Sequence, residues 1–219
     1  MSIIAILMAL VLSMLPSTTN TAKKLQAKQT ETAIVAAIVA YQTDNAKLPS
    51  LDPDQLLTQA DPDADTIVGD AAAAPSADIH YHNSALFNTL RALNAAPNLA
   101  DRTNPRHIVY FDDRAVNNPD FPKNGFLDVL GASGRSAEQK GCLFDPWGME
   151  YFVVLDTSYN NLLNVSAVYH DITYPDSAPH GPAGVFALGL DRKVGSATLP
   201  PNVYQTSATN VSDDVVSWR

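Results

Sequence analysis

The sequence is poor in cysteine: its 219 residues include one, Cys142. A single thiol cannot form a disulfide within the chain, and it cannot supply the set of thiolates that holds a structural zinc ion. A lone cysteine is most often a small, buried apolar residue, and we expect that role for Cys142. The sequence therefore excludes a disulfide-stabilised fold and a cysteine-rich zinc module.

Positive charge is also scarce. Lys and Arg total 14 against 23 Asp and Glu, which gives a net charge of -9. A protein that binds nucleic acid needs a basic face to meet the phosphates, so we exclude nucleic acid as a partner. The excess of carboxylates favours solubility and offers ligands to hard cations such as Ca²⁺.

Signatures of catalysis are missing as well. The chain has no G-x-S-x-G elbow, and the Gly-rich residues 131–136 lack the Lys-Ser/Thr ending of a phosphate-binding loop. His80 and His82 would share one face of a strand, as zinc ligands can, but no third ligand lies at a suitable spacing. We interpret both as surface or strand histidines, and we predict that the chain is not an enzyme.

The apolar run at the start of the chain is short. Residues 3–15 (IIAILMALVLSML) are apolar except for Ser13, whereas a membrane-spanning helix needs about 20 such residues. Only Met1 and Ser2 precede the run, so it also lacks the basic segment of a secretory signal peptide. Neither ordinary interpretation of an N-terminal apolar segment fits.

A second helical pattern follows the apolar run. Ile34, Ile38 and Tyr41 recur at helical spacing, which predicts one long helix that is apolar in its first half and amphipathic in its second. The sequence YQTDNAKLPS at residues 41–50 then stops the helix, because Asp and Asn compete for backbone hydrogen bonds and Pro49 cannot continue it.

The C-terminal part of the chain is typical of strands and turns. FDPWGMEYFVVLD at residues 144–156 predicts a tight turn around Trp147, which we interpret as a core anchor, followed by a strand with a buried face. We predict strands near residues 150–156, 163–169 and 183–188. In the middle of the chain, a helix that begins with Ser84 as N-cap and a short strand at residues 106–113 are expected.

Three features together carry a resemblance to a known family. The pattern Tyr41-x-x-Asp44-Asn45-x-x-x-Pro49-Ser50, the contiguous Asp145–Gly148 followed by Tyr151, and the long N-terminal helix resemble the type IV pilins, and most closely the major pseudopilins of type II secretion. The family begins its mature chain with Phe-Thr-Leu-x-Glu after a basic leader. We therefore interpret Met1 as an internal methionine of a protein whose leader and first residues are missing here; the alternative is a complete protein with a short buried helix.

The resemblance implies a fold and an organisation. The expected fold is α+β: a long N-terminal helix packed on a small antiparallel sheet, with a large helical or loop insertion. Residues 1–50 would form the membrane and assembly helix, residues 51–140 a variable insertion with no counterpart in the family, and residues 141–219 the sheet and a C-terminal calcium-binding loop.

The resemblance also implies a function. The chain would be a structural subunit of a periplasmic pseudopilus filament, anchored in the inner membrane by a single helix with its globular domain in the periplasm. Its partners would be copies of itself, other pseudopilins, inner-membrane assembly proteins and the membrane. Three alternatives stay open: a type IV pilus subunit for adhesion or DNA uptake, a membrane-anchored calcium-dependent binding module, and a secreted hydrolase.

A calcium site is the one cofactor site that the resemblance implies. In the family, a turn after a strand and an Asp-Asp pair near the C-terminus hold the ion, and oxygen ligands from loops suit calcium in general. Two features depart from the family: Arg192 stands where glycine is usual, and the spacing from Asp191 to Asp213 is longer. The alternative is a solvated acidic C-terminus. The implied ligands are the carbonyls of Leu188 and Val211 and the carboxylates of Asp191, Asp213 and Asp214.

Overall fold

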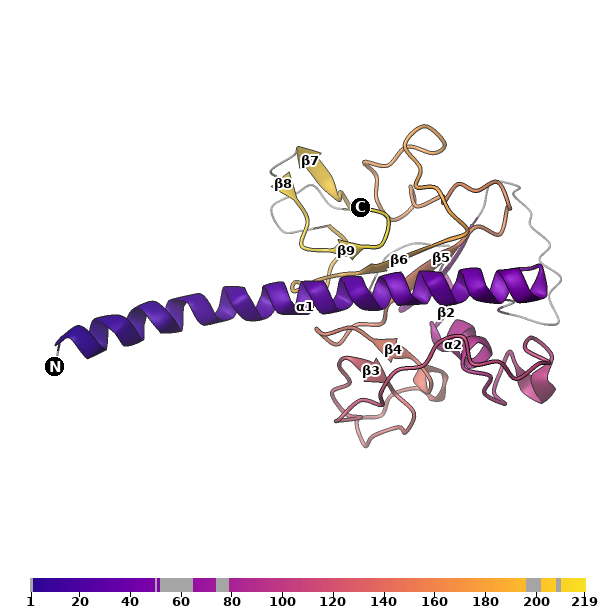
Figure 1. Ribbon diagram of the computed structural model, residues 1–219, viewed down its shortest axis with the longest axis horizontal. Coiled ribbons are helices and arrows are strands. Elements are labelled where there is room, and N and C mark those ends of the chain that lie inside the picture. Colours follow the sequence, from indigo (N-terminus) through magenta and orange to yellow (C-terminus); the bar gives the residue numbers. More distant parts are fainter. Residues whose placement is uncertain (1, 50, 52–64, 74–78, 196–201, 208–209) are drawn as a thin grey trace.

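A computed structural model describes residues 2–49, 51, 65–73, 79–195, 202–207 and 210–219. It is an α+β structure in which one long helix lies along a small sheet (Figure 1). The helices are α1 (Ser2–Asn45) and α2 (Ser84–Leu90), with short 3₁₀ turns at Leu99–Asp101 and Ala137–Gln139. The strands are β1 (Thr66–Val68), β2 (Ile79–Tyr81), β3 (Gly125–Phe126), β4 (Leu143–Phe144), β5 (Phe152–Leu155), β6 (Ala183–Ala187), β7 (Gln205–Ser207), β8 (Asn210–Val211) and β9 (Val215–Val216).

The central sheet has the strand order β2-β1-β5-β6-β9, and only its β1–β2 pair is parallel. Alternate side chains of β5 enter two different cores: Val153 faces α1, while Phe152 stacks on Phe186 of β6 on the opposite face, with ring centroids 4.8 Å apart. Because both faces of the sheet are covered, residues 151–155 are a continuous apolar run rather than an alternating one.

The second half of α1 packs on the sheet as the apolar stripe predicts. Ile34, Ile38 and Tyr41 are all fully buried in the core that α1 shares with β5, β6 and β9. The ammonium group of Lys28 donates hydrogen bonds to the carbonyls of Val216 and Arg219, which joins the helix to the end of the chain. The first half of α1 extends past the sheet (Figure 1). Among the described residues, no helix contains an apolar stretch of the length needed to cross a bilayer.

The helix ends at Asn45, as the stop signal predicts, and its last turn anchors the middle of the chain. Ala46 has a left-handed backbone (φ 54°), and the side-chain amide of Asn45 donates to the carbonyl of Tyr41 at 3.0 Å. The same amide donates to the Tyr110 hydroxyl at 3.1 Å, and the Tyr41 hydroxyl donates to the carbonyl of Thr103. Tyr41 and Asn45 at the helix end therefore fasten the segment between α2 and β3 to α1.

Two predicted strands are wrong. Residues 163–169 form a turn-rich loop, in which the amides of Val168 and Tyr169 both donate to the carbonyl of Val165. Their apolar side chains are buried because the loop covers the core on the face of the sheet opposite α1. The apolar pattern of residues 163–169 therefore results from packing against this core and not from strand pairing. Residues 106–113 form no strand in the described part of the chain: Arg106 lies in a turn and His107 has a left-handed backbone (φ 53°). The amides of Tyr110 and Phe111 donate instead to the carbonyl of Leu90.

The middle of the chain also departs in detail from the prediction. The helix α2 begins at Ser84, but Asn83 is its N-cap residue, and the Ser84 hydroxyl donates to the carbonyl of Glu138 at 2.8 Å. The segment expected to be a helical or loop insertion with one short strand at residues 106–113 also contributes β1 and β2 to the sheet. Strands of three residues are too short to show a period in the sequence.

One acidic residue of α1 points into the core. Glu31 is fully buried, and neither of its carboxylate oxygens accepts a hydrogen bond from the described part of the chain. Burial raises the pKa of Glu31 well above its ordinary value of 4.5, and the nearby Asp145 and Asp214 carboxylates raise it further against an opposing effect of Lys28. The folded state therefore favours the protonated, neutral side chain.

This burial predicts how stability depends on pH. Because the pKa of Glu31 is raised on folding, its contribution to stability is fully present below its unfolded pKa and is lost as pH rises through the folded pKa. We expect Glu31→Met to increase the free energy of unfolding at about pH 8 by at least about 1 kcal/mol, and to gain less at about pH 5. Urea unfolding in calcium-free buffer measures both values.

Glu138→Met is the matched control, since Glu138 is exposed. It should leave the pH dependence of wild type unchanged. A Glu31→Met protein that is less stable than wild type at the higher pH would contradict the expectation that the buried carboxylate is unfavourable there.

Candidate calcium site

The turn after β6 brings the chain close to the C-terminal acids. Gly189 has a left-handed backbone (φ 70°), and a Cβ atom there would lie 2.5 Å from the carbonyl oxygen of Asp213. A side chain at this position would push the two segments apart. Leu188, which precedes the glycine, is fully buried and fixes the turn in the second core.

The three predicted carboxylates meet at this turn. One oxygen each of Asp191, Asp213 and Asp214 lies within 4.8 Å of the others. The Asp213 carboxylate accepts hydrogen bonds from the amides of Leu190 at 2.7 Å and Asp191 at 3.2 Å. The turn after β6 and the segment between β8 and β9 are thereby held together, although the two acids that meet are 22 residues apart.

The surroundings of Asp214 give the strongest support for a cation at this turn. Its Oδ2 accepts hydrogen bonds from the Tyr169 hydroxyl at 2.9 Å and from the amide of Gly195 at 2.8 Å. Its Oδ1 is buried and, among the described residues, has no hydrogen-bond donor. Burial raises the pKa of Asp214 to about 8, and the Asp213 and Asp191 carboxylates also raise it.

The donor set fits calcium in kind. Three carboxylates within bridging distance, one with an unpartnered buried oxygen, provide the hard oxygen ligands that Ca²⁺ prefers. A divalent ion would offset the repulsion among the three acids and favour the ionised form of Asp214. Leu188 lies one residue after β6, and Val211 ends β8 two residues before Asp213; their carbonyls as ligands stay a prediction.

Arg192 and the long spacing have structural explanations. Arg192 has the left-handed backbone (φ 60°) that glycine favours, and its guanidinium donates to the carbonyl of Trp147 at 2.8 Å. The positive charge is therefore held by the turn at residues 145–148. The chain between Asp191 and Asp213 includes the β7–β8 hairpin, which the structure places beside the site as a separate two-stranded sheet.

The turn around Trp147 packs as predicted. Trp147 is 2 % exposed in the core beneath α1, and its indole N–H donates to the side chain of Asn20 at 3.1 Å. Asp145 closes the turn by accepting hydrogen bonds from the amides of Trp147, Gly148 and Met149. Nothing in this geometry gives the tryptophan a role beyond packing.

Sequence reasoning missed two residues near the acids. Tyr169 bonds directly to Asp214, but its place in a predicted strand concealed this role. Burial and the Asp214 carboxylate raise the pKa of Tyr169, and Glu31 on α1 raises it further. An acidic residue within an apolar helical stripe was the available signal for Glu31.

Comparison of the chain with protein-family models, with curated proteins and with solved structures gives no match.

Calcium binding predicts a measurable stabilisation. At a free Ca²⁺ concentration of about 100 times the Kd, linkage adds about 2.7 kcal/mol to the free energy of unfolding. For a chain of this size we expect Tm to rise by about 5–10 °C relative to chelator-treated protein. Asp213→Asn should abolish most of this shift, because it removes the ligand that also joins the two loops.

Thermal unfolding monitored by circular dichroism, with Ca²⁺ and with chelator, tests this. Asp176→Asn is the matched control, since Asp176 is an exposed acid outside the cluster and should keep the full shift. Equal Tm values for the wild-type protein in the two buffers would show that the three acids hold no calcium.

Proposed function

We propose that the chain is a structural subunit of a helical filament of the type IV pilin class, in the manner of a type II secretion major pseudopilin. The observation that carries the proposal is the shape of α1. Its second half is buried across the sheet, while its first half extends alone beyond the globular part (Figure 1). The part of α1 that extends beyond the sheet is suited to pack against the same helix of neighbouring subunits.

Exposed apolar side chains support the same idea. Leu25 and Val39 of α1 are 61 % and 40 % exposed, respectively. They are 14 residues apart, close to four helical turns at about 3.6 residues per turn, so they share one face. That face lies opposite the buried stripe of Ile34 and Ile38, where a neighbouring subunit in a filament would contact it.

The remaining assignments follow from the filament proposal. The subunit would be held in the inner membrane through its N-terminal helix, with its globular domain in the periplasm. Copies of itself, other pseudopilins and inner-membrane assembly proteins would be its partners. Calcium would order the C-terminal loop, and the chain would have no catalytic activity. A type IV pilus subunit is the second candidate and shares all of these features except the destination of the filament.

The filament makes a prediction that a closed dimer does not. In head-to-tail stacking, one position of a subunit meets a different position of the next. The double variant Leu25→Cys/Val39→Cys should therefore give a ladder of cross-linked multimers in cells, while each single variant gives little product. Treatment of intact cells with a thiol cross-linker, followed by immunoblotting, is the measurement.

The native thiol does not interfere, because Cys142 is fully buried. Val129→Cys, at an exposed residue between β3 and β4, is the control for random collision and should leave monomers. A single α1 variant that gives mainly dimers would indicate an isologous pair and would contradict the filament.

A further inference from the structure

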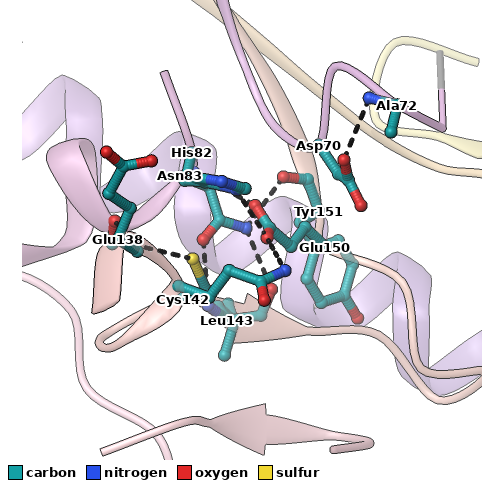
Figure 2. A network of polar contacts seen from close by, with 11 residues as sticks. Asp70, Ala72, His82, Asn83, Glu138, Cys142, Leu143, Glu150 and Tyr151 are labelled. Carbon is teal, nitrogen blue, oxygen red and sulfur yellow. Dashed lines mark hydrogen bonds and ion pairs between the residues drawn. The ribbon is translucent and has the colours of Figure 1, made fainter. Parts of the chain in front are cut away.

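Three potential metal ligands converge at a place outside the calcium site. His82 follows β2, Cys142 precedes β4, and Glu150 lies between the turn at Trp147 and β5 (Figure 2). These positions are far apart in sequence, which is why spacing alone gave His82 no third ligand. One donor atom from each residue lies within 4.8 Å of the other two.

The group is already arranged by hydrogen bonds. His82 Nδ1 lies 2.9 Å from Glu150 Oε1, and the amide of Asn83 donates to Glu150 Oε2 at 3.3 Å. The Asn83 side chain is tied to both neighbouring strands, since it donates to the carbonyls of Leu143 and Tyr151 and accepts from the amide of Leu143. The carboxylate is thus oriented by backbone that is itself fixed, as the ligands of a metal site are by their surroundings.

The site is buried but has an entrance. Glu150 is 1 % exposed and Cys142 is fully buried, whereas His82 is partly exposed. His82 lines a cavity of about 1100 Å³, together with Ser84, Glu138 and Gly141. Of the three residues, His82 is the one that lines this cavity, so the group meets the cavity at the imidazole.

We propose that His82, Cys142 and Glu150 form a binding site for a thiophilic divalent metal ion of the zinc class. Imidazole nitrogen, thiolate sulfur and carboxylate oxygen are the three ligand types that zinc takes in proteins. Three protein ligands leave one of four tetrahedral positions to water or to a molecule in the cavity. A thiolate in the set disfavours calcium and magnesium, which prefer oxygen.

Protons compete with a metal ion for the ligand atoms of His82 and Cys142. Burial raises the pKa of the Cys142 thiol, and the hydrogen bond to Glu150 raises the pKa of His82. Metal binding displaces the proton that His82 shares with Glu150 and the proton on sulfur. The affinity for metal should therefore rise with pH.

Titration of the full chain with Co²⁺, followed by competition with Zn²⁺, tests the site. Saturating calcium is kept in the buffer so that the Asp191 cluster is occupied. We expect one Co²⁺ per chain, a thiolate-to-cobalt charge-transfer band, and displacement by Zn²⁺. Cys142→Ser should remove the band, and His82→Gln should weaken metal binding by about 10- to 100-fold or more.

Two controls separate this site from others. His107→Gln changes an exposed histidine that pairs with Asp101 at 3.1 Å, and Asp213→Asn changes the calcium cluster; both should leave the cobalt band intact. His82→Gln leaves the buried thiol in place, so it stays informative if Cys142→Ser does not fold. The absence of the band in folded wild-type protein, or zinc affinity unchanged in His82→Gln, would overturn the proposal. Neither result bears on the filament, because the site does not depend on it.

Discussion

The packing of α1 across the sheet is the interaction on which the rest of the structure depends. A sheet of short strands has little stability by itself, and the helix stripe of Ile34, Ile38 and Tyr41 packs in its first core. The residues that carry the family resemblance lie in this same core: Tyr41 ends the stripe, and Trp147 and Tyr151 lie against it. The motifs are therefore best understood as the positions where separate segments meet the helix.

The packing of α1 on the sheet leaves several carboxyl groups buried, which opposes folding when they are ionised. Glu31 on the helix, Asp145 in the turn and Asp214 before β9 each have at least one buried oxygen that accepts no hydrogen bond from the described residues. Burial raises the pKa of all three, and the Glu31 pKa is raised further by the other two carboxylates. Such groups can be accommodated by protonation or by a cation, and the acid cluster of Asp191, Asp213 and Asp214 lies where a cation would act on one of them.

The longer elements could be predicted from the sequence, whereas the shortest strands could not. The helix stripe, its end at Asn45 and the strands around residues 150–156 and 183–188 could be predicted. The helix combines a clear period with a stop signal, and each of the two strands is an apolar run beside a turn signal. The strands β1 and β2 have three residues each, and the apolar residues of 163–169 are buried under a loop. The local sequence pattern cannot distinguish the short strands β1 and β2 from the buried loop at residues 163–169. In each, burial depends on segments that are distant in the chain.

The candidate metal sites were also only partly predictable from the sequence. A family pattern led to the three acids at the calcium site, but no local pattern predicts that Asp214 would bond to Tyr169 or that His82 would meet Cys142 and Glu150. Those pairs depend on how the sheet is ordered. Residues separated by more than 40 positions become neighbours only when the strands between them are in place.

The candidate calcium site and the helix are connected through one short strand. Asp213 and Asp214 directly precede β9, which pairs with β6 and contacts α1. Lys28 of α1 donates to the carbonyl of Val216 in this strand and to that of Arg219 at the end of the chain. A cation that fixes the two acids therefore fixes the start of β9, and through it the point where the packed half of α1 gives way to the half that extends beyond the sheet. In a filament held together by that helix, an ordered C-terminal loop would set the angle at which the globular part leaves the filament core.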